Sequence, residues 1–96
     1  MPAAVRVGDP NNAGGLVIGP GALSVFINGR PAALSGDRVS PHFCCGKPGC
    51  SIHCAAITTI GSTGVFADGR PIVYQGSPDS CGHVRALGST DVIVGR

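Results

Sequence analysis

Short apolar runs alternate with polar, glycine-rich breaks along the chain, and one such pattern occurs twice. The segment ALSVFINGRPAALSGD, residues 22–37, returns in altered form as TGVFADGRPIVYQGS, residues 63–77, with matching positions 40 apart. Within each copy an Asn-Gly or Asp-Gly pair separates two apolar runs. Such pairs favour a type I′ turn, because both central residues of that turn adopt positive φ. The pattern therefore predicts two β-hairpins.

The two ends of the chain carry a third copy, split between them. PAAVRVGD, residues 2–9, matches the second strand of the repeat with its following loop, and GSTDVIVGR, residues 88–96, matches the first strand. Repeats of this length are usually stacked or radially arranged units that do not fold alone. We therefore expect a pseudo-threefold set of units with the termini close together. The units are residues 88–96 plus 2–15, residues 19–42 and residues 60–83.

The polar connections between the hairpins carry almost no helical signal. SIHCAAITT, residues 51–59, is long enough for one helical turn, but its β-branched tail favours strand or irregular structure. We expect a single all-β domain over residues 1–96, with little or no helix and with its polar loops gathered at one end. Residues 43–54 form a Cys/His-rich insert in the second of these loops.

Composition narrows the class of protein. The 16 glycines and 8 prolines punctuate a periodic pattern, so they indicate turns in a small domain with a thin core. The net charge is +2, without a cluster of Lys or Arg and without tryptophan, so nucleic-acid binding is not expected. No apolar run approaches the ~18 residues that a membrane span needs, and we expect no stable membrane insertion. The start, MPAAVRVGDP, lacks the regions of a Sec signal, which predicts a protein made in the cytoplasm.

Charged residues beside the predicted turns have ordinary interpretations. Arg30 and Arg70, each before a proline, are expected to be solvated turn residues. Asp9 and Asp37, each after a glycine, are expected to accept backbone hydrogen bonds within their loops.

Metal-binding residue types gather in the second and third connecting loops. They are three histidines and five cysteines: His42, His53, His83, Cys44, Cys45, Cys50, Cys54 and Cys81. Imidazole and thiolate groups are ligands that Zn²⁺ takes four at a time in a tetrahedron, and imidazole-rich sites also accept iron or nickel. No C-x-x-C pair is present, so the clustering, not the spacing, indicates a metal site where the loops meet.

Five cysteines cannot all bind one ion, and other roles stay open for some of them. The alternatives are inert burial, or a disulfide such as Cys50–Cys54 or Cys45–Cys50. Adjacent Cys44 and Cys45 are a poor disulfide pair, because the eight-membered ring strains the peptide.

The repeated motifs resemble a known family. PAAVRVGD, GRPAALSGD, the VFINGRP hairpin, the Cys after GSPDS and the closing GSTDVIVG are similar to the PAAR-repeat family, and the resemblance covers essentially the whole chain. It implies a cone-shaped cap of three hairpin-like units around a pseudo-threefold axis. Such caps sit on the trimeric β-helix of VgrG-like spikes in type VI secretion systems, or on spikes of contractile phage tails. The family binds a metal near the apex, usually zinc, through histidines and a cysteine.

The resemblance also implies particular ligands. His42 in SPH, His53 after the Cys-containing insert and Cys81 in SCG match the metal-binding positions of the family. The first loop departs from the pattern, because Ala13 stands where many members carry a histidine. We therefore expect His83 as the fourth ligand, with Cys45 or Cys54 as substitutes, and zinc as the metal, with iron as the alternative.

Three functions are compatible with such a sequence. The leading hypothesis is a structural, non-enzymatic tip that caps a trimeric spike, one copy per trimer, helps it pierce a membrane and is delivered outside the cell with it. A second is an adaptor that recruits toxin effectors to the spike without covalent attachment. A third is a small enzyme with a Cys/His pair, Cys81 with His83 or Cys54 with His53, which lacks any recognisable orienting group or oxyanion hole.

Overall fold

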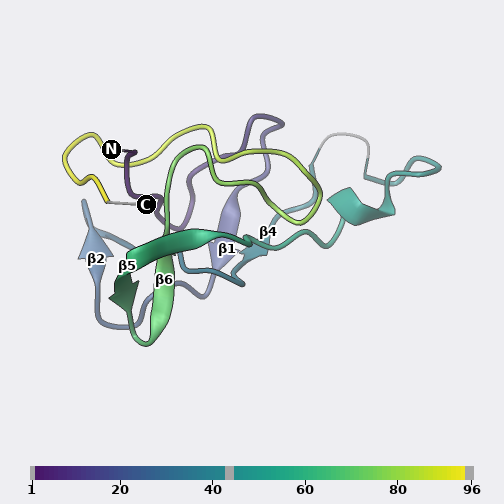
Figure 1. The fold of residues 1–96 in the computed structure, drawn as a ribbon. Helices are drawn as coiled ribbons and strands as arrows, with labels where there is room; N and C mark the ends of the chain where they lie inside the picture. The colour runs from purple at the N-terminus through teal and green to yellow at the C-terminus, as the bar shows by residue number, and fades with distance from the viewer. Residues whose placement is uncertain (1, 43–44, 95–96) are drawn as a thin grey trace.

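The computed structural model describes residues 2–42 and 45–94. Within them the chain is essentially all-β, as predicted, with one short 3₁₀ helix and no α-helix (Figure 1). The elements in chain order are β1 Val17–Gly19, β2 Phe26–Ile27, β3 Arg30–Pro31, β4 Arg38–Val39, the 3₁₀ helix η1 Ser51–His53, β5 Gly61–Ala67 and β6 Arg70–Val73. The three strand pairs, β1–β4, β2–β3 and β5–β6, are antiparallel.

The two predicted hairpins are present and share one register. Phe26 faces Pro31 in the β2–β3 hairpin, and Phe66 faces Pro71 in the β5–β6 hairpin. The turn residues Asn28 and Asp68 have φ of 54° and 50°, and the glycine after each also has positive φ. These are the conformations that a type I′ turn requires, so the Asn-Gly and Asp-Gly pairs determined the hairpins locally.

The chain ends form a third pair in the same register. Ala3 bridges Ile93, and the Val94 amide donates to the Pro2 carbonyl at 2.9 Å. Ile93 occupies the position of the phenylalanines at the first two hairpins, and Ala3 that of the prolines. The first and last described residues, Pro2 and Val94, accordingly lie next to each other.

A closed ring of backbone hydrogen bonds joins the three units at the centre. The Val5 amide donates to the Val73 carbonyl, the Val73 amide donates to the Ala33 carbonyl, and the Ala33 amide donates to the Val5 carbonyl, each at 2.9 Å. All three residues are fully buried. Each unit thus donates to one neighbour and accepts from the other, which is the pattern of a pseudo-threefold axis. We call Val5, Ala33 and Val73 the axial ring.

The side chains around the axial ring are small and aliphatic. They form two clusters of buried residues: Ala4, Ala22, Ile27, Ala32, Leu34, Ala67, Ile72 and Val94, and then Val17 with the axial ring itself. No aromatic ring is buried among the described residues. Three chain segments can approach the axis this closely because their central side chains are no larger than valine.

Two arginines and two aspartates link neighbouring units. Asp9 and Asp37 accept backbone hydrogen bonds in their own loops, as predicted. Arg30 also pairs with Asp9 at 2.9 Å, and Arg70 pairs with Asp37 at 3.2 Å, so the expectation that these arginines are merely solvated was wrong. At the third equivalent position Ser77 replaces the aspartate, and its buried hydroxyl has no hydrogen-bond partner among the described residues.

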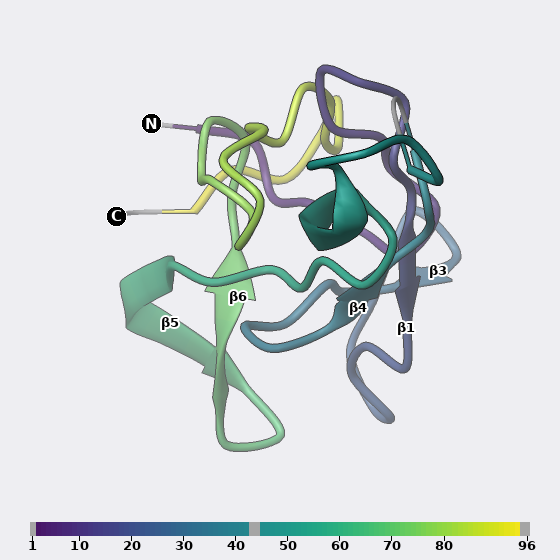
Figure 2. The same ribbon diagram turned by 90° about the vertical axis from the view of Figure 1, so that its right-hand side faces the viewer.

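The molecule is elongated, with principal extents of 38 × 24 × 22 Å. The hairpins and the paired segments near both chain ends occupy one end, and the insert with η1 projects from the opposite end (Figure 1). Figure 2 views the molecule from the insert end, with the hairpin units and the terminal segments arranged around its axis. Within residues 2–42 and 45–94, no helix is long and apolar enough to cross a membrane.

Candidate metal centre

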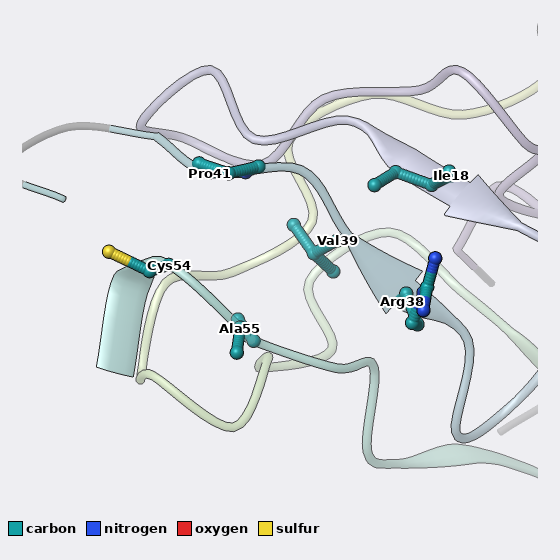
Figure 3. A pocket seen from close by; sticks show the side chains of 7 residues that line it. Ile18, Arg38, Val39, Pro41, Cys54 and Ala55 are labelled. Carbon is teal, nitrogen blue, oxygen red and sulfur yellow. The ribbon is translucent and has the colours of Figure 1, made fainter. Parts of the chain in front are cut away.

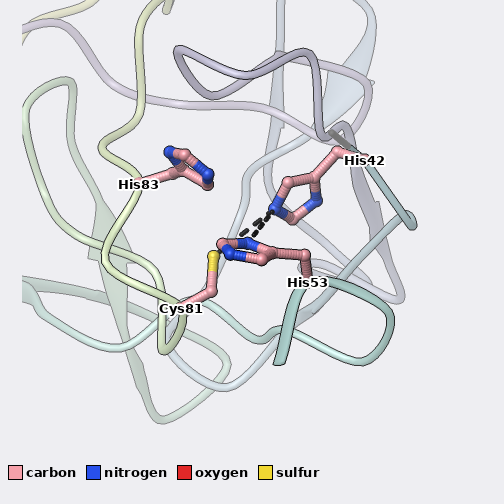
Figure 4. A group of neighbouring side chains, drawn as sticks. All are labelled: His42, His53, Cys81 and His83. Carbon is pink, nitrogen blue, oxygen red and sulfur yellow. Dashed lines mark hydrogen bonds between the residues drawn. The ribbon is translucent and has the colours of Figure 1, made fainter. Parts of the chain in front are cut away.

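Four predicted ligands from two loops come together near the insert (Figure 4). His42 follows β4 and His53 is the last residue of η1, so both belong to the second loop. Cys81 and His83 belong to the third loop. All four side chains are partly exposed, so an ion can reach them from solvent.

The distances between donor atoms fit a four-coordinate ion. His42 Nε2 lies 3.2 Å from His53 Nδ1 and 3.4 Å from Cys81 Sγ. Tetrahedral ligands about 2.0–2.3 Å from zinc are separated by roughly 3.3–3.6 Å. No two of the four ligand atoms are more than 4.8 Å apart, so a small rotation of a ring closes the tetrahedron.

A backbone carbonyl orients the His42 ring. Its Nδ1 lies 2.8 Å from the carbonyl oxygen of Ser40, which can only accept, so Nδ1 carries the proton. In the neutral ring the lone pair is then on Nε2, the nitrogen that faces His53 and Cys81. Metal-binding histidines in proteins are held in the same way by a partner on the second nitrogen.

The environment of His53 favours the form that binds metal. Desolvation lowers the pKa of His53 below its ordinary value of 6.5, and the neighbouring His83 and His42 lower it further. Three clustered imidazoles repel one another when protonated, whereas an ion would use their lone pairs.

The third loop presents its two ligands through a tight turn. The Asp79 amide donates to the His83 carbonyl at 2.7 Å, and the Gly82 amide donates to the Asp79 carbonyl at 2.9 Å. Gly82, between the two ligands, has φ of 95°, a backbone conformation that residues other than glycine rarely adopt. The turn directs Cys81 and His83 toward the same point (Figure 4).

The first loop supplies no ligand and is held by buried polar side chains that the sequence analysis missed. Arg85 donates to the carbonyl oxygens of Asp9 and Gly15, both at 3.0 Å. Its guanidinium also pairs with Asp79 at 2.7 Å, and Asn11 donates to the same carboxylate at 2.9 Å. Arg85 thus ties both sides of the first loop to the third loop.

Aligning the three repeats could have identified Arg85 as a buried residue, because it stands at a position that is uncharged in the other two repeats. Residues 17, 58 and 85 occupy equivalent places, since each donates to the loop of its own unit, and the first two are Val17 and Thr58. A charged residue at a buried position of the repeat needs a buried partner. The loop itself packs on the metal centre, because a Cβ added to Gly15 would lie 2.6 Å from His42 Nδ1.

The cysteines of the insert differ from the expectation. Cys45 is bonded to Cys54, whereas the pairs considered from the sequence were Cys50–Cys54 and Cys45–Cys50. Cys50 is also disulfide-bonded, and Cys44 lies outside the described residues. While this bond is intact, neither Cys45 nor Cys54 offers a thiolate as a substitute ligand, and Cys54 has no free thiol to act with His53. Cys81 is the free cysteine among the described residues.

A shallow groove lies on one flank, between the β1–β4 pair and the insert (Figure 3). Its volume is about 270 Å³, and its lining is mostly apolar: Ile18, Val39, Pro41, Cys54, Ala55 and Ala56, with Arg38 as the charged member. The Arg38 side chain is exposed and has no ion-pair or hydrogen-bond partner within residues 2–42 and 45–94.

The donor set of the cluster suits zinc. Imidazole nitrogens and thiolates are the ligand types of closed four-coordinate Zn²⁺ sites, and imidazole-rich sets also accept iron. If bound, the ion would be held by His42, His53, Cys81 and His83. It would join the second loop to the third, since each loop provides two of the four ligands.

Fold and site together define a small all-β domain with threefold internal repetition and a His/Cys cluster at one end. The chain belongs to the PAAR-motif family, whose family model matches residues 7–84. That family is associated with the spike tips of type VI secretion systems and is a structural family, not a family of enzymes. A search of curated proteins found no match.

Proposed function

We propose that this protein caps and sharpens the trimeric central spike of a contractile injection machine, one copy per trimer. The supporting observation is at the hairpin end. Phe26, Phe66 and Ile93 occupy equivalent positions in the three pairs and are 59%, 57% and 59% exposed. We call these residues the base triad.

The base triad suits a partner with three identical subunits. A single chain can contact three equal surfaces in the same way only if it presents three similar contacts itself. Burying the exposed part of each triad side chain would contribute on the order of 1–2 kcal/mol. The partner we infer is a trimeric β-helical spike of the VgrG or phage-tail type.

The docking proposal is tested by co-purification with a trimeric spike protein from the same genome. Replacing any one triad residue with aspartate is expected to weaken binding at least about tenfold, because 1.4 kcal/mol corresponds to a factor of ten. Ile52→Asp is the matched control, since Ile52 is 56% exposed but lies on η1 at the other end. Equal loss of binding in the control and the triad variants would contradict the proposal.

The sharpening role requires a stable apex, and we propose that one zinc ion provides it through His42, His53, Cys81 and His83. A metal bound only by the folded state contributes directly to folding free energy. Elemental analysis of protein purified without added metal should find one equivalent per chain. His42→Ala and Cys81→Ser should each lose the metal, whereas Thr63→Ala, an exposed change at the opposite end, should retain it. A metal-free wild-type protein would refute this part.

The flank groove favours a second candidate function, recruitment of an effector. Arg38 interrupts the threefold pattern, because Pro10 and Pro78 occupy the equivalent positions. An apolar groove with one unpaired cation suits an extended segment that carries an apolar side chain and a carboxylate. Arg38→Glu is then expected to abolish co-purification of an effector while spike binding is retained. Unchanged effector binding would count against this candidate.

A further inference from the structure

We propose that the Cys45–Cys54 disulfide is a redox-controlled clasp that fixes His42 and His53 as a ligand pair, so that the metal affinity of the tip depends on the oxidation state of the insert. The inference rests on the proposed metal site. It begins from position in the chain: Cys45 follows His42 by three residues, and Cys54 directly follows His53.

The clasp closes the neck of the insert beside both ligands. The Cα atoms of Cys45 and Cys54 are 5.0 Å apart. The Cys45 amide donates to the His42 carbonyl at 2.9 Å, so this half of the disulfide is attached to one ligand. The other half is covalently adjacent to the second ligand. The two ends of the insert are also joined by one long hydrogen bond, from the His42 amide to the His53 carbonyl at 3.3 Å.

Besides its disulfides and local backbone hydrogen bonds, the described part of the insert buries little surface. No residue of η1 is buried, and Ile52 is mostly exposed. The residues at 46–49 are exposed as well. A segment that buries so little apolar surface opens at low free energy unless covalent bonds restrain it. His42 and His53 lie at the two ends of the insert, so opening of the insert would move these two ligands apart.

The other two ligands do not depend on the clasp. Cys81 and His83 are separated by one residue and are held by the hydrogen-bonded turn of the third loop. The Ser80 amide also donates to the Ile57 carbonyl at 2.8 Å, which anchors this turn to the body of the domain. Opening the clasp should therefore loosen one ligand pair while the other stays formed.

The redox step is an ordinary thiol–disulfide exchange. The thiols of Cys45 and Cys54 form one S–S bond and pass two protons and two electrons to an acceptor disulfide, which leaves as two thiols. Both cysteines are partly exposed, so a small disulfide or thiol can reach them. The site would be tight in oxidising surroundings and weaker in reducing ones.

The test is the dissociation constant for zinc, measured by competition with a chromophoric chelator on the full chain. Oxidised wild-type protein is expected to bind about 10–100 times more tightly than the same protein reduced under anaerobic conditions, the range for closing a loop of this length or losing an outer-shell partner. Cys45→Ser/Cys54→Ser is expected to bind like the reduced protein with or without reductant. Cys50→Ser, with its remaining disulfide verified by mass spectrometry, should keep the tight, reductant-sensitive site.

Amide exchange at the axial ring monitors the fold separately, because a global loss of structure would also weaken binding. Protection at Val5, Ala33 and Val73 should be the same in all forms. Equal zinc affinities for oxidised, reduced and Cys45→Ser/Cys54→Ser proteins would overturn the clasp while leaving the metal site intact. Tighter binding after reduction would also overturn it, since the freed thiolates would then be joining the ion. Absence of zinc binding by oxidised wild-type protein would instead refute the metal site and the clasp together.

Discussion

At the scale of single residues, Arg85 and Asp79 form a buried ion pair whose side chains are fully shielded from solvent. Removing one partner of such a pair leaves an uncompensated charge and typically costs about 3–5 kcal/mol, whereas replacing both with apolar residues is often tolerated. In the repeat, Val17 and Val39 occupy the positions of Arg85 and Asp79, and they face each other across one of three equivalent bridges, the others being Asn11–Arg85 and Thr58–Asp79. A purely apolar pair is therefore already accommodated once in this fold.

We predict that Arg85→Met alone destabilises the protein by about 3–5 kcal/mol and that Asp79→Val/Arg85→Met costs less than the single change. The carbonyl oxygens of Asp9 and Gly15 keep partners without Arg85, because they accept the Val17 amide at 3.2 Å and the Asn11 amide at 2.8 Å. Urea unfolding of the two single variants and the double variant measures the coupling. Additive losses would show that the charges act independently.

Asp68 provides a prediction about pH. It accepts hydrogen bonds from the Ser24 hydroxyl at 2.7 Å and from the amides of Leu23 and Ser24 at 2.6 and 3.2 Å, in the loop of the neighbouring unit. The hydrogen bond from the Ser24 side chain lowers the pKa of Asp68 below its ordinary value of 3.8, and the backbone amides lower it further. The carboxylate therefore stabilises the fold above pH 3.8, and this contribution is lost as the pH falls through the lower folded pKa.

We expect Asp68→Asn to be less stable than wild type at neutral pH and to approach it in acid, where wild-type Asp68 is protonated. Thermal unfolding across pH 2–7 follows the difference. NMR titration of the Asp68 carboxyl in Ser24→Ala should show its pKa rising toward the ordinary value. A stability difference that does not change with pH would assign the effect to side-chain geometry and not to charge.

At the scale of elements, the sequence specified the hairpins better than the loops. Asn-Gly and Asp-Gly turns encode positive φ over a few residues, so the β2–β3 and β5–β6 hairpins could be predicted without knowledge of the fold. The pairing of cysteines could not, because five thiols within one short insert and a neighbouring loop allow many connections. The buried interaction of Arg85 with Asp79 was likewise invisible until the loops were placed together.

Two glycines in β5 test how closely the strands approach one another. A Cβ added to Gly61 would lie 2.5 Å from the Pro71 Cβ and 3.0 Å from its backbone, whereas one added to Gly64 would meet nothing within 4 Å. We predict that Gly61→Ala costs about 1–3 kcal/mol, as overpacking of a tight site usually does, and that Gly64→Ala is neutral or slightly stabilising. Similar unfolding midpoints for the two variants would mean that β6 moves aside easily.

At the scale of the whole molecule, the proposed docking surface and the candidate metal centre lie at opposite ends (Figure 1). The base triad belongs to the two hairpins and the terminal pair, and the His/Cys cluster belongs to the loops and the insert. The three hydrogen bonds of the axial ring connect Val5, Ala33 and Val73 without using any ligand residue. The hairpin end should therefore keep its structure when the metal end is disturbed.

Removal of the metal tests this independence. If zinc is present at about 100 times its dissociation constant, binding stabilises the fold by about 2.7 kcal/mol, which for a domain of this size corresponds to roughly 10–20 °C in Tm. We predict that a chelator lowers Tm by this amount and increases amide exchange near His42 and His53. At temperatures well below the Tm of the metal-free protein, the amides of Val5, Ala33 and Val73 should stay protected from exchange. Docking to the spike should be unchanged. If chelation also abolished spike binding or exposed the axial ring, the metal would be organising the entire fold, and the two ends would have to be treated as one cooperative unit.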